Sequence, residues 1–287
     1  MTAALRRATV FSGYPAAPPS PAPLSPPPGF AKASPSPGDK RMNPGKQPPA
    51  RPRQWVASVS VNAEEPDFLR TARASYDAMA PDYAAHVPDG LLTRPLDRAL
   101  VTAFADLVRD NGPAPVADLG CGLGHVTARL DALGVPVFGV DLSPRMVSLA
   151  RRAHPGLRFH VGTVTALDLP PETLGGIAAL DVVGHVPTGH LSTVFTEFQR
   201  ILVPGGQVLL GFRAGTDDGT RLTERFGHGI ELDHYWHAPE TITGQLAEAG
   251  LLVHARTLLD PDEDDKRDRV FLLVRKPSAG RPQQSGA

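Results

Sequence analysis

The chain has 287 residues, a formal net charge of −1 and a single cysteine. Its first 53 residues hold 14 of the 31 prolines and eight Lys or Arg against one acid, so this segment carries +7 and the rest of the chain −8. A segment so poor in apolar residues cannot offset the entropy of ordering its backbone. We therefore predict a disordered, basic tail over residues 1–62, and a second short one over residues 278–287.

The same composition excludes several classes of protein. The acidic body disfavours a surface that follows nucleic-acid phosphates, and one cysteine cannot form an internal disulfide. No apolar run approaches the roughly 20 residues that span a bilayer, and no apolar stretch follows the two N-terminal arginines as in a secretory signal. We expect a cytoplasmic protein that contacts no membrane.

Residues 63–112 carry two helical patterns. Apolar residues recur at three- and four-residue intervals from Asp67, including Tyr76 and Tyr83, and a second such stretch covers residues 96–108. An Asn-Gly-Pro sequence at residues 111–113 ends the second stretch. This pattern predicts a helical lid at the N-terminal side of the main domain.

Residues 113–277 alternate short apolar runs with amphipathic ones. The predicted strands are residues 116–119, 136–140, 157–161, 177–183, 207–212, 251–258 and 270–274. The predicted helices between them are residues 125–133, 144–152, 191–202 and 239–249, with Ser143 as the cap of the second. This alternation is typical of a doubly wound, Rossmann-like α/β fold, a seven-stranded, mostly parallel sheet with helices on both faces. The short charged link before the last strand predicts that this strand is antiparallel.

A glycine-rich turn follows the first predicted strand. Gly120, Gly122 and Gly124 let the backbone approach a ligand closely, and Asp141 ends the second strand, where it can accept bonds from a ribose. Together they predict an adenosine-containing ligand. The spacing lacks the last glycine of the dinucleotide fingerprint, and Asp118 would repel a pyrophosphate but suit an ammonium or sulfonium group.

Three segments, residues 116–124, 137–146 and 202–206, resemble motifs of the class I S-adenosylmethionine-dependent methyltransferases of the small-molecule type. The resemblance covers residues 68–276 and implies S-adenosylmethionine as the cofactor. Thr163 departs from the pattern, because many relatives carry an acid there for the adenine amino group. The cofactor-binding residues that the resemblance implies are Tyr76, Tyr83, Asp118, Gly120, Gly122, Gly124, Asp141, Leu142, Met146 and Thr163.

The acceptor side is predicted from position and chemistry. His185 follows the fourth predicted strand, at the sheet end where ligands bind, and an imidazole suits the general base that a hydroxyl acceptor requires. Arg213, His228 and Tyr235 follow the fifth strand and are predicted to orient the substrate. We expect transfer of a methyl group to an oxygen of a small metabolite, with a nitrogen or a carbon as the less favoured alternative.

Other functions compete with this one. A nucleic-acid methyltransferase is disfavoured because residues 181–185 lack the Asn/Asp-Pro-Pro-aromatic motif expected of a base-flipping enzyme. A non-catalytic sensor or assembly protein would carry the same cofactor motifs, and a nicotinamide-dependent oxidoreductase is a more distant alternative. The histidines at 228, 234 and 237 do not provide a firm third metal ligand, so no metal is predicted. The sequence names neither the acceptor nor the oligomeric state.

Overall fold

The computed structural model describes residues 65–87, 94–261 and 266–278, all within the compact unit Ala57–Ala287. The predicted tail at residues 1–62 lies outside the described residues, as do residues 279–287 of the predicted C-terminal tail.

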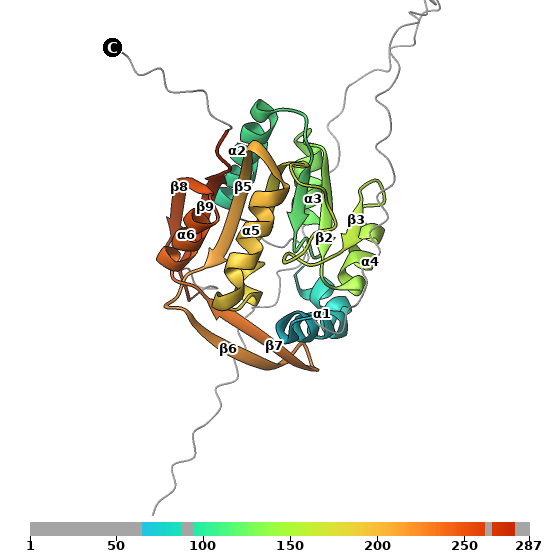
Figure 1. The fold of residues 1–287 in the computed structure, drawn as a ribbon. Helices are drawn as coiled ribbons and strands as arrows, with labels where there is room; N and C mark the ends of the chain where they lie inside the picture. The colour runs from blue at the N-terminus through green and yellow to red at the C-terminus, as the bar shows by residue number, and fades with distance from the viewer. Residues whose placement is uncertain (1–64, 88–93, 262–265, 279–287) are drawn as a thin grey trace, which may run out of the picture. The chain divides into compact units, whose positions relative to one another are not determined.

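Seven strands form one sheet in the order β3-β2-β1-β4-β5-β9-β8 (Figure 1). Neighbours from β3 to β5 are parallel, whereas β9 runs antiparallel to both β5 and β8. The predicted fold class and the antiparallel last strand are therefore confirmed. The strands are β1 (Val116–Leu119), β2 (Val137–Asp141), β3 (Phe159–Val161), β4 (Leu174–Leu180), β5 (Leu202–Arg213), β8 (Leu252–Leu259) and β9 (Arg269–Arg275).

Helices cover both faces of this sheet because consecutive strand residues point to opposite sides. Ile177 packs in one apolar cluster with Phe195 and Leu246, whereas Ala178 packs in another with Phe104 and Leu130. The first face is therefore covered by α5 and α6, and the second by α2 and α3. The helices are α1 (Asp67–His86), α2 (Pro95–Asn111), α3 (His125–Ala132), α4 (Pro144–Ala153), α5 (Leu191–Ile201) and α6 (Pro239–Glu248).

The predicted helix cap at Ser143 is confirmed. Its hydroxyl accepts a hydrogen bond of 3.0 Å from the amide of Met146, and Pro144 occupies the first turn of α4. The cap satisfies one of the amides that a helix N-terminus leaves without a partner.

The prediction for the fourth strand was wrong at both ends. The strand covers Leu174–Leu180 instead of residues 177–183, because Asp181 has a φ of +60° and breaks the extended backbone. The chain then forms a 3-10 turn, η2 (Val183–His185). His185 consequently lies on a compact turn at the carboxyl end of β4.

A hairpin that the sequence did not predict follows β5. It consists of β6 (Asp218–Arg225) and β7 (His228–Trp236). The strand β7 lies beside α1 (Figure 1), and its side chains Ile230 and Leu232 pack with Ala72 and Met79 of α1. The hairpin and α1 therefore form one cover beside the carboxyl ends of the strands.

Candidate functional site

The glycine turn after β1 depends on glycine for two different reasons. Gly120, Gly122 and Gly124 all have positive φ angles, of +68°, +50° and +84°. A Cβ at Gly120 would lie 2.9 Å from Val182, and one at Gly124 would lie 2.7 Å from Phe159. A Cβ at Gly122 would meet no atom within 4 Å. The middle glycine thus faces open space, where a ligand can reach the backbone.

Asp141 connects the end of β2 to this turn. One carboxylate oxygen accepts from the amide of Gly122 and the other from the amide of Ser143, both at 2.8 Å. Burial nevertheless raises the pKa of Asp141. Each oxygen keeps a lone pair for a further donor, so the carboxylate can fix the turn and still accept hydrogen bonds from a ribose.

Asp118 on β1 is buried and accepts a hydrogen bond of 2.5 Å from the hydroxyl of Thr127. Burial raises the pKa of Asp118 to about 7. A positive ligand group would stabilise the ionised carboxylate that burial disfavours. Together with the open side of Gly122, these two acids fit a cofactor that carries a ribose and a cationic group.

The three residues predicted beside the adenine differ in exposure. Leu142 is partly buried, Met146 is fully buried, and the hydroxyl of Thr163 lies 2.9 Å from that of Thr165. Their contact with adenine stays a prediction.

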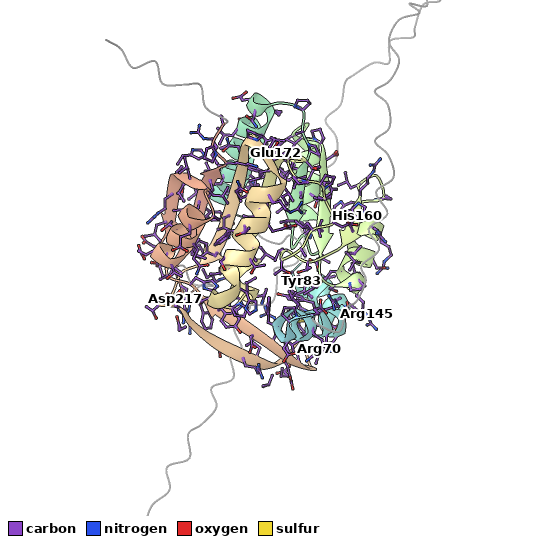
Figure 2. The ribbon with its side chains drawn as sticks, viewed as in Figure 1. Arg70, Tyr83, Arg145, His160, Glu172 and Asp217 are labelled. Atoms are coloured by element: carbon purple, nitrogen blue, oxygen red, sulfur yellow. The ribbon has the colours of Figure 1, made fainter. Side chains whose placement is uncertain are left out.

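The helix α1 is fastened to the loop after β2. Asp77 accepts hydrogen bonds from the Ser143 hydroxyl at 2.5 Å and from the Arg145 amide at 3.0 Å. Figure 2 shows Arg145 where α4 lies beside α1. Arg73 donates to the Leu142 carbonyl at 3.3 Å. The sequence did not single out Asp77, although it directly follows Tyr76 in the segment predicted to cover the cofactor.

Tyr76 and His185 form a hydrogen-bonded pair. The Tyr76 hydroxyl lies 2.7 Å from Nε2 of His185, and Nδ1 of His185 lies 3.2 Å from the carbonyl oxygen of Asp233. Because a carbonyl only accepts, Nδ1 carries the proton and donates it. Nε2 of the neutral ring then accepts from the Tyr76 hydroxyl. The basic nitrogen of His185 is thus defined, and Tyr76 engages it.

Burial changes the ionisation of both partners. It lowers the pKa of His185, because the charged ring would lose solvation, and raises the pKa of Tyr76 for the same reason. Both groups are therefore neutral near pH 7. Tyr83 extends the contact, with its ring 6.2 Å from that of Tyr76 and edge-on to it.

His234 on β7 was not predicted to act at the site. Its ring centroid is 5.1 Å from that of His185, edge-on, and 5.2 Å from that of Trp236. A Cβ at Gly184 would lie 3.2 Å from Nε2 of His234, so the glycine makes room for this ring. Burial and the neighbouring charge of His185 lower the pKa of His234 to about 3. An alternation of side chains along residues 228–236 could have revealed it.

The three predicted acceptor-side residues lie at different places. Arg213 is 3.5 Å from the carboxylate of Asp181, and His228 is 2.7 Å from that of Asp82 on α1. Tyr235 stacks on His237, on the opposite face of β7 from His234. The structure thus brings His234 against His185 and turns Tyr235 away from that ring. The predicted binding roles of all three residues stay predictions.

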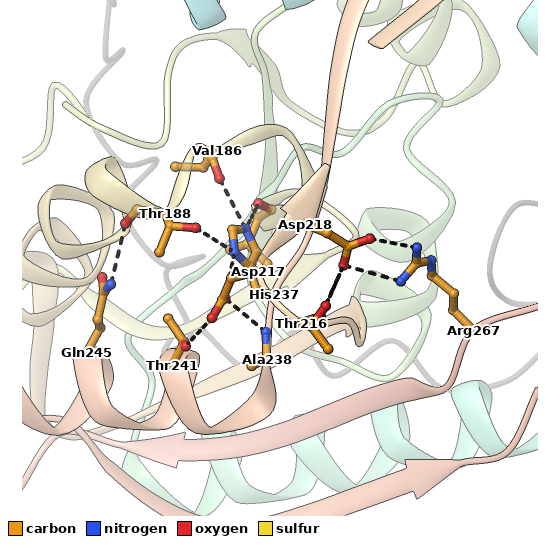
Figure 3. Close-up of polar contacts among 11 residues, drawn as sticks. Val186, Thr188, Thr216, Asp217, Asp218, His237, Ala238, Thr241, Gln245 and Arg267 are labelled. Atoms are coloured by element: carbon orange, nitrogen blue, oxygen red, sulfur yellow. Dashed lines mark hydrogen bonds and ion pairs between the residues drawn. The ribbon is translucent and has the colours of Figure 1, made fainter. Parts of the chain in front are cut away.

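His237 holds the turn that carries His185 (Figure 3). Its Nε2 donates to the carbonyls of Val183 and Val186, both at 3.1 Å, and its Nδ1 lies 3.4 Å from the hydroxyl of Thr188. Asp217 fixes the chain after His237 by accepting from the Ala238 amide at 3.0 Å. The end of β7 is therefore bonded to both sides of His185.

Within the described ranges, no three His, Cys, Asp or Glu side chains come close enough together to hold a metal ion. No helix in the described part of the chain has the length and apolar character needed to cross a membrane.

A parallel sheet with a glycine turn after β1 and an acid at the end of β2 defines the class of Rossmann-like domains that bind adenosine-containing ligands. The ligand lies at the carboxyl ends of the strands in this class. Asp118, the glycine turn, Asp141 and His185 all lie at this end of the sheet.

Among Rossmann-like domains, comparison with known proteins points to methyltransferases. Residues 116–206 match the family model of a methyltransferase domain. The chain is 39% identical over 98 residues to a trans-aconitate 2-methyltransferase of Methylobacterium nodulans, covering 33% of this chain and 36% of that protein. It is 28% identical over 162 residues to a ubiquinone biosynthesis O-methyltransferase of Xanthomonas oryzae, covering 54% and 62%. The chain thus spans less than two thirds of these relatives.

A solved structure shares the fold. The magnesium protoporphyrin IX methyltransferase of Synechocystis, determined with bound S-adenosylmethionine, superposes with a TM-score of 0.55 at 20% identity, over 75% of this chain and all of that one. Residues 116–206 thus match a methyltransferase domain, and the sheet that contains them has the fold of this S-adenosylmethionine-bound enzyme. The resemblance and the cofactor inferred from the sequence are confirmed.

Proposed function

We propose that this protein transfers the methyl group of S-adenosylmethionine to an oxygen of a small-molecule acceptor, and that His185 takes the acceptor's proton. The observation that carries the proposal is the position of Nε2 of His185. Gly120 of the cofactor turn lies directly against Val182, three residues before His185. The base and the cofactor turn are therefore parts of one packed unit.

The cofactor, when bound, supplies a methyl group activated by the positive sulfonium. The chain's own residues would hold and orient it: Asp141 and the open side of Gly122 on the ribose side, Asp118 on the side of the cationic methionine portion. Alignment of donor and acceptor in a displacement reaction contributes a large share of such catalysis.

His185 supplies the proton transfer. Its Nδ1 is fixed on the Asp233 carbonyl, so Nε2 presents its lone pair. In the structure that lone pair accepts from Tyr76. An acceptor hydroxyl that replaces the Tyr76 hydroxyl at Nε2 would give its proton to this nitrogen as its oxygen takes the methyl group, and the carbon–sulfur bond of the cofactor would break to leave neutral S-adenosylhomocysteine. The lowered pKa keeps His185 neutral and able to accept a proton at neutral pH.

The relatives support a small acceptor, since one is named for the methylation of trans-aconitate and the other for an O-methylation in ubiquinone biosynthesis. We extend the proposal to α1 as a lid over the site, in the closed position through Asp77 and Tyr76. The other helix of the predicted lid, α2, packs on one face of the sheet instead. The cytoplasmic location expected from the sequence stays a prediction.

The test is transfer of labelled methyl groups from S-adenosylmethionine to the small molecules of a cell extract. We expect His185→Ala to lower transfer by about 100-fold or more, the usual contribution of a general base, while the Kd of S-adenosylhomocysteine is unchanged. His254→Ala, in an exposed position on β8, is the matched control. Undiminished transfer by His185→Ala would remove His185 as the base.

Two other results would replace the proposal. Binding of S-adenosylhomocysteine without any labelled product would indicate the non-catalytic sensor or assembly protein. Label in RNA or DNA, with binding that weakens steeply as salt rises, would indicate a nucleic-acid methyltransferase.

A further inference from the structure

We propose that the inner face of the β6–β7 hairpin binds a negatively charged group of the methyl acceptor, a carboxylate or another small anion, through Arg225 and His234. The inference rests on the proposed function, because it assigns the acceptor's chemical class at the same site. It names two residues that the sequence did not place in the acceptor site.

The strand register puts these two side chains on one face. Arg225 pairs with His228, and Leu222 pairs with Leu232. Directly opposed residues of an antiparallel pair point to the same side. Along β7, His228, Leu232 and His234 share a face because they lie an even number of residues apart. His228 reaches Asp82 of α1 and His234 reaches His185, so this face is the inner one.

A series of contacts between aromatic rings connects Arg225 to His185, the proposed base. The Arg225 guanidinium lies 5.1 Å from the centroid of the Phe226 ring, and Phe226 is edge-on to Tyr83 at 6.2 Å. Tyr83 is in turn edge-on to Tyr76, whose hydroxyl contacts His185. The positive charge of Arg225 also contributes to the lowered pKa of both His185 and His234, so Arg225 lies within electrostatic range of the two rings.

Arg225 differs from Arg221 and Arg267, two other arginines near the hairpin, because each of those two forms an ion pair. Arg221 pairs with Asp233 at 2.7 Å, and Arg267 pairs with Asp218 at 2.9 Å. Among the residues that the structure describes, no carboxylate lies within ion-pair distance of Arg225, although its side chain is partly buried. A partly buried guanidinium without a counter-charge is unfavourable, and its planar donors match a carboxylate. An anionic ligand would supply the missing charge.

His234 provides the second contact. In the described residues its ring makes only ring contacts, and neither nitrogen has a hydrogen-bond partner. Burial, together with the neighbouring positive groups, lowers the pKa of His234. The ring therefore stays neutral, and its N–H is available to donate to an anion. Arg213 and Arg267 are paired with Asp181 and Asp218, so the charge of Arg225 is the one that favours an acidic acceptor over a neutral or cationic one.

The test separates a small-molecule cell extract on an anion-exchange resin at pH 7.5 and assays both fractions with methyl-labelled S-adenosylmethionine. The full-length protein and three variants are compared. Arg225→Gln removes the charge, Arg225→Lys keeps it, and Arg221→Gln is the control on the opposite face of the same strand. The Kd of S-adenosylhomocysteine is measured for each.

We expect the labelled product to arise from the retained, anionic fraction. Arg225→Gln should raise the amount of that fraction needed for half-maximal transfer about tenfold or more, as expected for loss of a charge-assisted bond. Arg225→Lys should restore part of the affinity, and Arg221→Gln should behave as the wild type. The Kd of S-adenosylhomocysteine should not change.

Three results would overturn the inference while leaving methyl transfer intact. Label arising only from the unretained fraction would mean a neutral or cationic acceptor. Equal half-saturation for wild type and Arg225→Gln would remove Arg225 from the acceptor site. A tenfold weaker Kd for S-adenosylhomocysteine in Arg225→Gln would assign Arg225 to the carboxylate of the cofactor. Absence of label in both fractions would instead reject the proposed function, and with it this inference.

Discussion

The cofactor side and the hairpin side of the site are built by different means. On the cofactor side, the contacts are local in sequence and use backbone amides: Asp141 binds the amide of Gly122, 19 residues away. On the hairpin side, the contacts join side chains far apart in the chain, with 109 residues between Tyr76 and His185 and 146 between Asp82 and His228. A local arrangement leaves a readable motif, whereas a long-range one depends on how the elements pack.

Loss of the central acid should have the largest effect on the cofactor side. Asp141→Ala removes two hydrogen bonds to backbone amides and the acceptor for the ribose, so we expect S-adenosylhomocysteine to bind about 10- to 100-fold more weakly, or about 1–3 kcal/mol. Calorimetry measures this, with Asp131→Ala at an exposed position of α3 as the control. An unchanged Kd for Asp141→Ala would show that Asp141 does not bind the ribose of the cofactor.

The two sides should also respond to acid in opposite directions. His234 has a folded-state pKa of about 3, below the usual 6.5, so the unfolded chain binds the proton first and stability falls as pH drops below 6.5. Between pH 6.5 and pH 5 this amounts to at most about 2 kcal/mol. Asp118 has a folded-state pKa raised to about 7, so the folded chain binds the proton first and stability rises as pH falls toward 4.

Urea unfolding at pH 7 and pH 5 separates these contributions. His234→Gln should lose less stability on acidification than the wild type, and Asp118→Asn should lose more. His254→Gln, at an exposed position outside the site, is the comparison variant. Burial lowers the pKa of His254 less than that of His234, so the change should have the same sign and be smaller. If both variants changed with pH as the wild type does, the difference in electrostatics between the two sides would be refuted.

The smallest expected effect distinguishes two glycines of one turn. Both Gly120→Ala and Gly122→Ala are strained, because each φ is positive. The new Cβ at Gly120 would in addition press on Val182, so Gly120→Ala should be less stable by about 1–2 kcal/mol than Gly122→Ala. Gly122→Ala should instead weaken S-adenosylhomocysteine binding, because the new Cβ would enter the open space that we assign to the cofactor. Equal stability of the two variants in urea would contradict the packing of the turn against η2.

The sequence predicted much of the fold because its signals are local. The cap at Ser143, the strand at residues 116–119 and the antiparallel last strand follow from residue types within a few positions of each other. The end of β4 was misplaced, because apolar residues continue beyond Asp181 at Val182 and Val183 although the backbone turns at Asp181. The hairpin was missed, since β6 is largely exposed and charged and shows little apolar alternation.

The amino-acid sequence by itself determined the cofactor, because the residues that indicate it, the spaced glycines, Asp118 and Asp141, all lie within residues 118–141. Only the tertiary structure decided which side chains surround His185. It set Tyr76 on Nε2, and it put His234 rather than Tyr235 against the ring. The reason is register, because a shift of one residue along β7 exchanges its two faces, and that register is fixed by packing against α1 and η2.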